Sequence, residues 1–253
     1  MRSELLRVAD SLGIRRGFAR GRNHLVELLT GSQANSVHRR NHLDDKHLKL
    51  LLSFVLRPDS NCLDVGAHRG VFLNHFRRVA PDGYHIAYEP LPDLCAELVL
   101  QFPEMDIRQM ALSNVENATS FVHVRNEPAY SGLIEHPYPK EMAIETITVK
   151  TERLDDHLPD GWLPTFVKID VEGAELLVLE GALQTLRRAK PVMAFEYGGG
   201  PEQFGGSEDD MFRILSKDIG LRLFDMDGHG PLELAQFKDG LATGERWNWI
   251  AHE

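Results

Sequence analysis

The chain has 253 residues, 42% hydrophobic and 26% charged, which is typical of a globular protein with one sizeable domain. No apolar run approaches the roughly 20 residues that a membrane helix needs, and the opening residues lack the apolar stretch of a signal peptide. The net charge of −10 is concentrated after residue 57, and this acidic body excludes a broad nucleic-acid-binding face. We therefore expect a cytoplasmic protein without an integral membrane segment.

Residues 1–57 predict a helical N-terminal extension, and residues 58–253 predict a single catalytic domain. Asp44 and Asp45 can cap a helix, and Pro58 prevents its continuation. Between these positions apolar residues recur at the spacing of one helical face, namely Leu48, Leu51, Leu52 and Val55.

Beyond residue 58, strand-like and helix-like segments alternate, which indicates a doubly wound α/β fold with a Rossmann-like sheet. Seven sheet strands are predicted, over residues 60–65, 84–88, 106–112, 165–170, 192–196, 221–226 and 247–251. Helices are predicted over residues 71–80, 92–102, 174–189 and 208–219. No helix is predicted between the last two strands, which favours an antiparallel last strand inserted into the sheet.

Two further β segments, residues 118–124 and 144–150, interrupt this alternation. The loop between them is rich in proline, tyrosine and charge. Because long loops in compact domains are usually functional or mobile, residues 125–143 predict a mobile element over the substrate cleft.

A turn with two glycines, Asp64 to Gly70 (DVGAHRG), follows the first strand and leads into a helix. Gly66 and Gly70 leave room for a ligand close to the backbone amides at a helix start. Asp64 is suited to hold the turn or to accept a hydrogen bond from a ligand's ammonium group. Glu89 ends the second strand 19 residues after Gly70, where an acidic residue accepts hydrogen bonds from both ribose hydroxyls.

A second charged motif, VKIDVEGAE over residues 167–175, lies where a strand leads into a helix. Lys168 and Asp170 alternate along the strand, so their side chains point to the same face. Burying acids and a lysine together is costly unless they serve a ligand, a metal or each other. Glu172 and Glu175 also have a structural interpretation, because acidic residues stabilise helix N-termini.

Together these motifs resemble the FkbM family of SAM-dependent methyltransferases over roughly residues 60–200. The matching motifs, in family order, start at Asp64 (DVGA), Tyr88 (YEP), Ala111 (ALS), Arg153 (RLD), Lys168 (KIDVEGAE) and Phe195 (FE). The resemblance implies a methyltransferase fold, SAM as cofactor, and O-methylation of a hydroxyl on a sugar, glycolipid or polyketide-type small molecule. The family has asparagine where this chain has His68.

The resemblance implies that Gly66, Gly70 and Glu89 bind SAM, with Ser113 near the adenine. Asp170 is the first candidate for the general base, because it ends a strand facing the expected methyl position, and Glu196 is the second. The full predicted cofactor-binding set is Asp64, Gly66, Ala67, His68, Gly70, Glu89, Leu112, Ser113 and Asp170.

Alternatives to this interpretation remain open. Asp170, Glu172 and Glu196 are of the type that binds Mg²⁺, but no Asp-Asn pair follows the motif, so no metal is assigned. One alternative function is an NAD-dependent oxidoreductase, although the chain lacks the G-x-G-x-x-G turn and the Tyr-x-x-x-Lys pair typical of such enzymes. Another alternative is a non-catalytic interaction protein of the same fold. The expected partner is a small-molecule or glycan acceptor, and a homo-oligomer stays open.

Overall fold

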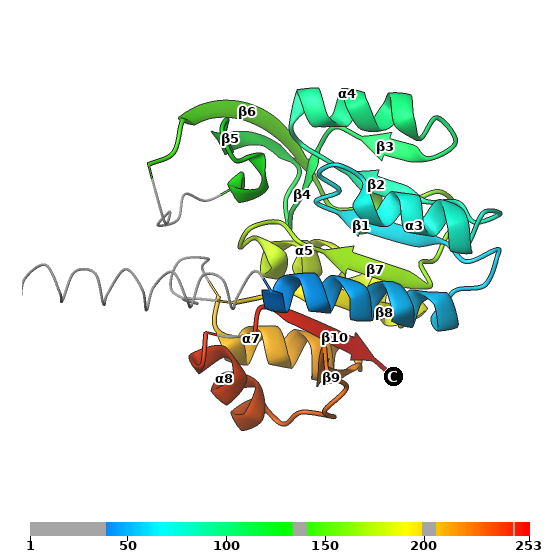
Figure 1. Ribbon diagram of the computed structural model, residues 1–253, viewed down its shortest axis with the longest axis vertical. Helices are drawn as coiled ribbons and strands as arrows, with labels where there is room; N and C mark the ends of the chain where they lie inside the picture. The colour runs from blue at the N-terminus through cyan, green and yellow to red at the C-terminus, as the bar shows by residue number, and fades with distance from the viewer. Residues whose placement is uncertain (1–38, 134–140, 199–205, 245) are drawn as a thin grey trace, which may run out of the picture. The chain divides into compact units, whose positions relative to one another are not determined.

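The computed structural model describes residues 39–133, 141–198, 206–244 and 246–253 (Figure 1). The chain divides into two units, Met1–Leu43 and Asp44–Glu253, and the features below belong to the second. Residues 39–55 are helical, and residues 44–55 of this helix lie in the second unit. Among the residues that the structure describes, no helix is both long enough and apolar enough to cross a membrane.

A seven-stranded sheet forms the centre of the second unit, in the order β3-β2-β1-β7-β8-β10-β9. Its strands are β1 (Cys62–Val65), β2 (Ile86–Tyr88), β3 (Asp106–Arg108), β7 (Phe166–Ile169), β8 (Val192–Glu196), β9 (Arg222–Asp225) and β10 (Asn248–His252). Only β10 runs antiparallel to its neighbours, and it lies between β8 and β9. The predicted seven-stranded α/β sheet with an inserted last strand is therefore confirmed.

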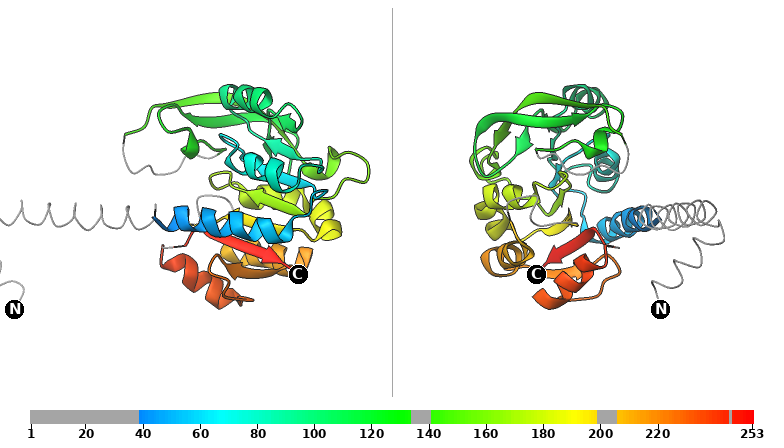
Figure 2. Two further views of the ribbon diagram at one scale, coloured as in Figure 1. Left: turned by 45° about the vertical axis from the view of Figure 1, so that its right-hand side comes forward. Right: turned by 90° about the vertical axis from the view of Figure 1, so that its left-hand side faces the viewer.

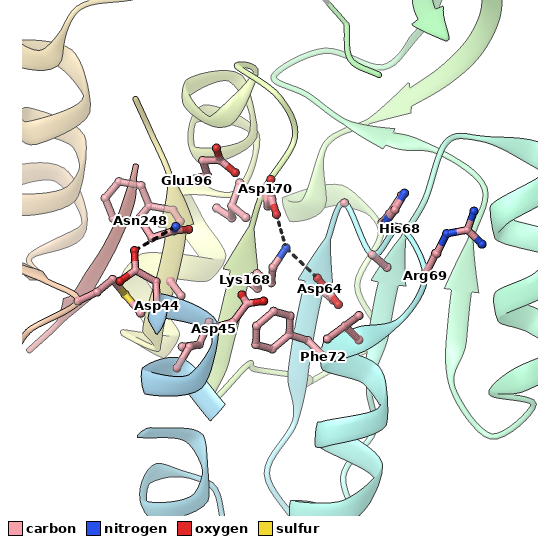
Figure 3. A pocket seen from close by; sticks show the side chains of 18 residues that line it. Asp44, Asp45, Asp64, His68, Arg69, Phe72, Lys168, Asp170, Glu196 and Asn248 are labelled. Carbon is pink, nitrogen blue, oxygen red and sulfur yellow. Dashed lines mark hydrogen bonds and ion pairs between the residues drawn. The ribbon is translucent and has the colours of Figure 1, made fainter. Parts of the chain in front are cut away.

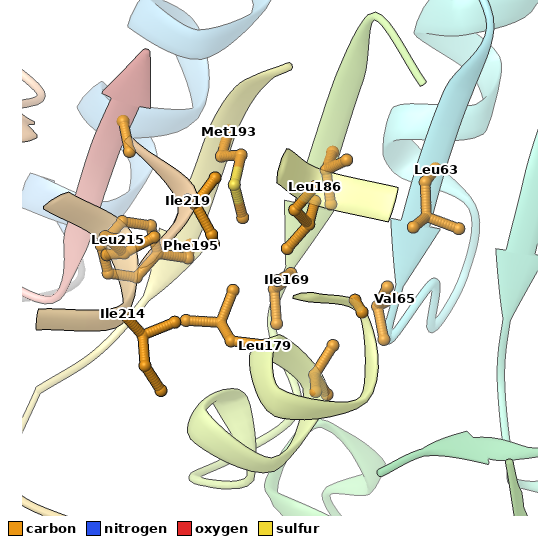
Figure 4. Packing of buried hydrophobic residues seen from close by; sticks show 14 of the residues in the cluster. Leu63, Val65, Ile169, Leu179, Leu186, Met193, Phe195, Ile214, Leu215 and Ile219 are labelled. Carbon is orange, nitrogen blue, oxygen red and sulfur yellow. The ribbon is translucent and has the colours of Figure 1, made fainter. Parts of the chain in front are cut away.

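Helices cover both faces of the sheet, as the nearly continuous burial along its central strands requires. They are α3 (Val71–Val79), α4 (Pro92–Gln101), α5 (Glu175–Gly181), α6 (Leu183–Ala189), α7 (Glu208–Arg213), η4 (Ile214–Ile219) and α8 (Leu234–Ala242). Leu63, Ile169 and Phe195 pack against α5, α6 and η4 (Figure 4). The intervening strand residues face helix 44–55 and α3, which lie on the other side of the sheet (Figure 2).

Helix 44–55 packs tightly on this second face. Leu48, Leu52 and Leu56 are buried in one cluster with Phe72 and Phe76 of α3. Residues 48–56 of the predicted N-terminal extension thus contribute to the core of this unit. The division of the chain into an extension and a catalytic domain stays a prediction.

Several predicted boundaries are wrong. The strand over residues 106–112 is two strands, because the chain turns after Arg108 and β4 (Ala111–Leu112) pairs with β6 (Ile144–Glu152). With β5 (Asn117–Val124), these strands form a separate three-stranded sheet. The helix over residues 174–189 is interrupted at Ala182, where the Asp155 carboxylate accepts hydrogen bonds from the first amides of α6.

The expectation that no helix separates the last two strands is also wrong. Helix α8 begins at Leu234, after the N-cap residue Glu233, and the side chains of Glu233 and Gln236 accept from each other's backbone amides in a capping box. Gly240 lowers the helix propensity of this segment and obscures its apolar spacing in the sequence. The antiparallel insertion of β10 does not depend on this connection.

The predicted mobile element, residues 125–143, connects β5 to β6. Its ends are paired, because the Arg125 amide donates to the Ala143 carbonyl at 2.8 Å and Gly132 bridges to Val122. Residues 134–140 lie outside the described residues. Mobility of the whole element stays a prediction.

Candidate active site at the carboxyl ends of the strands

A cavity of about 220 Å³ opens at the carboxyl ends of β1, β7 and β8. The strand order reverses between β1 and β7, which is where open α/β sheets bind ligands. The turn after β1, the ends of β7 and β8, Asn248 and the start of helix 44–55 line the cavity (Figure 3). Of the predicted site residues, Asp64, Gly66, Ala67, His68, Asp170 and Glu196 line it.

The space that the two glycines of the turn leave open is occupied by other parts of the protein. Gly66 has φ +82°, and a Cβ there would lie 1.8 Å from the Asp170 carbonyl oxygen. A Cβ on Gly70, at φ +70°, would lie 2.6 Å from the ring of Phe102. His68 also adopts a left-handed conformation, at φ +48°, which histidine and asparagine tolerate better than most residues. The exchange of asparagine for His68 is therefore compatible with the turn.

Most backbone amides of this turn already donate hydrogen bonds within the protein. Those of Gly66 and Ala67 donate to the Tyr88 carbonyl at 3.0 Å, and that of His68 donates to Glu89 Oε2 at 2.8 Å. The first turn of α3 has no side-chain cap, because Gly70 occupies the N-cap position. A ligand carboxylate would therefore meet the amides of α3 rather than those of the turn.

Glu89 lies behind the turn and does not line the cavity. Glu89 is 4% exposed, and its carboxylate accepts hydrogen bonds from the amides of His68 and Leu91. Burial raises the pKa of Glu89 to about 7 despite these bonds. Each oxygen keeps a lone pair, so the carboxylate can still accept from ribose hydroxyls. Leu112 and Ser113 are buried and also lie outside the cavity wall.

A buried lysine connects two carboxylates across the sheet. Lys168 pairs with Asp64 in the register of β7 and β1, so both side chains lie on the same face. Lys168 Nζ is 2.9 Å from Asp170 Oδ2 and 3.8 Å from Asp64 Oδ1. The alternation of Lys168 and Asp170 on one face is confirmed. Asp64 Oδ1 is buried without a hydrogen-bond partner among the described residues.

Burial and their mutual interactions shift the pKa values of Asp64, Lys168 and Asp170. Burial raises the pKa of Asp64 to about 6, although Lys168 opposes the shift. Burial alone would lower the pKa of Lys168, but Asp170 and Asp64 raise it. Burial alone would likewise raise the pKa of Asp170, but Lys168 and a hydrogen bond from Glu196 hold it below its usual value. Asp170 is therefore ionised at neutral pH.

Glu196 and Glu172 complete an acidic group around Asp170. Burial and the charge of Asp170 raise the pKa of both carboxyls well above the usual value, so Glu196 donates a hydrogen bond to Asp170. One oxygen from each of the three lies within 4.8 Å of the others, as Mg²⁺ ligands would. Lys168 already supplies a cation to Asp170, and the absence of a metal stays a prediction. Glu175 instead holds the turn, accepting from the amides of Val171 and Gly173 at 3.1 Å.

The sequence did not identify Asp44, Asp45 and Asn248 as residues of this cavity. The side-chain amide of Asn248 donates to Asp44 Oδ2 at 3.4 Å, which joins β10 to helix 44–55. In the sequence, Asp44 and Asp45 were recognisable only as candidate helix-capping residues. A capping pattern cannot show that the helix start reaches the strand ends, because that placement depends on tertiary packing.

The buried Asp64 carboxyl predicts a pH-dependent change in stability. Its folded pKa exceeds its unfolded value near 4, so stability from its protonated form is fully present below pH 4 and lost as pH rises through about 6. We expect Asp64→Asn to stabilise the ligand-free protein at pH 8 by on the order of 2 kcal/mol, and hardly at pH 4. Urea unfolding at both pH values measures this, with the exposed Asp59→Asn as control. Equal effects at both pH values would contradict it.

The comparisons with known proteins agree with these motifs. Residues 64–223 match the family described as the methyltransferase FkbM domain. The 2-O-methyltransferase NoeI of Sinorhizobium fredii is 27% identical over 157 residues, which cover 55% of this chain and 64% of NoeI. The AMB antimetabolite synthetase AmbE of Pseudomonas aeruginosa is 33% identical over 86 residues, which cover 32% of this chain and 4% of AmbE. The chain thus spans less than two thirds of either relative.

Among solved structures, the methyltransferase FkbM of Methylobacillus flagellatus KT aligns with a TM-score of 0.49 and 17% identity, covering 78% of this chain and 44% of that one. The family match is the stronger finding. It extends over more than half of the chain and includes both the glycine turn and the Lys168–Glu175 motif. The chain therefore belongs to the FkbM methyltransferase domain family.

Proposed function

We propose that the protein transfers the methyl group of SAM to a hydroxyl oxygen of a small molecule or glycan. The observation that carries this proposal is the pairing of Asp170 and Glu196 at the ends of neighbouring strands, beside the glycine turn and open to one cavity. Membership of the FkbM family supports SAM as the methyl donor. The name of the relative NoeI, a 2-O-methyltransferase, supports an oxygen acceptor.

The site offers suitable partners for each part of SAM. We assign the ribose hydroxyls to Glu89 and the adenine to the neighbourhood of Ser113, with Leu112 also in the cofactor-binding set. The uncapped first turn of α3 suits the carboxylate, and the unsatisfied Asp64 Oδ1 suits an ammonium donor. Bound SAM would supply a methyl group on a positively charged sulfur; the O–CH3 bond would form as the CH3–S bond breaks, and S-adenosylhomocysteine would leave.

The protein's own tasks are to orient the acceptor and to receive its proton. The free lone pairs of the Asp170 carboxylate accept the hydroxyl hydrogen bond, and its Oδ2 is fixed by Lys168. As the oxygen forms its bond to the methyl carbon, the hydroxyl becomes acidic and Asp170 takes the proton. Glu196, which is protonated, holds Asp170 from the other side through its hydrogen bond. Lys168 thus positions the base without contacting the acceptor.

Loss of Glu89 should weaken cofactor binding. Glu89→Ala removes both ribose hydrogen bonds to a charged acceptor, and we expect this to cost about 2–3 kcal/mol of SAM affinity. Calorimetry with SAM measures the change. Glu89→Gln keeps an acceptor oxygen for only one of the two amides of His68 and Leu91, so this variant should lose less affinity than Glu89→Ala. Unchanged affinity in both variants contradicts the ribose assignment.

Labelled SAM provides the direct test of the proposed function. The purified chain is incubated with methyl-labelled SAM and pooled small molecules, glycans and proteins, and the labelled fraction is identified. We expect label on an oxygen of a small molecule or glycan. Binding of SAM without transfer to any pool would favour the non-catalytic alternative. A thermal shift with NAD but not with SAM would favour the oxidoreductase alternative.

A further inference from the structure

Helix 44–55 forms a wall of the cavity and brings the carboxylate of Asp45 to it. Asp44 and Asp45 both line the cavity, although both precede the family-matched residues 64–223. Asp44 bonds to Asn248. Asp45 is half-buried and makes no hydrogen bond or ion pair with the described residues. Figure 3 shows its side chain extending from the helix toward Lys168 and Asp64.

A second oxygen in the same cavity lacks a donor. Asp64 is 1% exposed, and its Oδ1 has no hydrogen-bond partner in the described part of the chain. Lys168 lies 3.8 Å away and donates to Asp170 instead. A buried acceptor without a donor is costly, so it indicates a place where a ligand donor binds.

Arg69, another charged residue of the cavity wall, does not supply the missing donor. Arg69 also lines the cavity, but its side chain is 59% exposed and pairs with Glu97 at 3.7 Å. An ammonium group has three donors, enough for two carboxylates at once. The cavity between the turn and the helix therefore suits a ligand ammonium rather than a second carboxylate.

We propose that Asp45, together with Asp64, binds the α-ammonium group of SAM, so that helix 44–55 is part of the cofactor site. This inference rests on the proposed function. With the ribose on Glu89 behind the turn, the amino-acid end of SAM would reach the cavity. The family match does not assign Asp45 a role, because it begins 19 residues later, at Asp64.

Two ligands that differ in the amino-acid end test the proposal. S-adenosylhomocysteine carries the ammonium and carboxylate, whereas 5′-methylthioadenosine keeps the nucleoside and sulfur without them. We expect Asp45→Asn to weaken binding of S-adenosylhomocysteine about 10- to 100-fold in calorimetry, since the lost hydrogen bond joins two charged groups. Binding of 5′-methylthioadenosine should change less than about twofold.

The controls separate a failed inference from a failed function. Asp59→Asn removes an exposed acid outside the cavity and should leave both affinities unchanged. Asp45→Glu restores the carboxylate and should recover part of the lost affinity. Equal losses for both ligands, or no loss for either, overturn the role of Asp45. A wild-type chain that binds neither ligand overturns the proposed function instead.

Discussion

Replacing Asp170 with asparagine is expected to lower kcat by about 10²–10⁴-fold, the usual contribution of a general base. The asparagine is nearly isosteric, but it cannot take the acceptor's proton. Because Asp170 lies at the end of β7, away from Glu89, the affinity for S-adenosylhomocysteine should change by well under about 1 kcal/mol. Single-turnover rates with labelled SAM, together with calorimetry, measure both quantities.

Glu196→Gln is the matched comparison for this variant. Glu196 is protonated and donates to Asp170, and a glutamine amide also donates, so we expect a loss of less than about tenfold. Full activity of Asp170→Asn together with an inactive Glu196→Gln would assign the base to Glu196. Parallel loss of cofactor binding and turnover in Asp170→Asn would make Asp170 a cofactor ligand. Restoration of its activity by added Mg²⁺ would favour a metal site.

Gly66→Ala is expected to lower the free energy of unfolding by between about 2 and 5 kcal/mol. A left-handed backbone costs an alanine about 1–2 kcal/mol, and an overlap that forces the backbone to move adds about 1–3. The added Cβ would lie 1.8 Å from the Asp170 carbonyl oxygen, which belongs to the backbone and cannot rotate away. The turn would separate from β7, so cofactor binding should fall as well. Denaturant unfolding and calorimetry measure these effects.

Gly161→Ala separates the two causes. Gly161 has φ +75°, nearly that of Gly66, but a Cβ there meets nothing within 4 Å. This variant should therefore show only the backbone cost of about 1–2 kcal/mol and no change in cofactor affinity. Equal losses in both variants would mean that the approach of the turn to β7 contributes little to stability.

Much of the sheet was predictable because the presence and parallel direction of its strands follow from local patterns. Short apolar segments alternating with helical ones indicate parallel strands, and the alternation of Lys168 and Asp170 gives their common face. The break between β3 and β4 was not predictable, because residues 106–112 contain no glycine or proline to mark a turn, and only the distant pairing of β4 with β6 divides the segment. Helix α8 was missed because Gly240 weakens its local signal.

The candidate site was predictable where chemistry and chain order coincide. Asp64, His68 and Asp170 line one cavity because they lie at or just after the carboxyl ends of the neighbouring strands β1 and β7. The role of the glycines was not predictable: a sequence shows that a Cβ is missing but not which atom occupies its place. Asp45 was missed for a similar reason, because its distance from β1 is set by how helix 44–55 packs on the sheet.

The position of β10 has a consequence for how the chain folds. β8 and β9 are made first, yet they never pair with each other, because β10 later inserts between them. Until it does, both strands have an open edge, and such edges recruit strands from other molecules. Sheet closure is thus a late step that joins segments distant in sequence, and such steps slow folding. At high concentration during refolding, β10 of one molecule can complete the sheet of another, which would produce a strand-exchanged dimer.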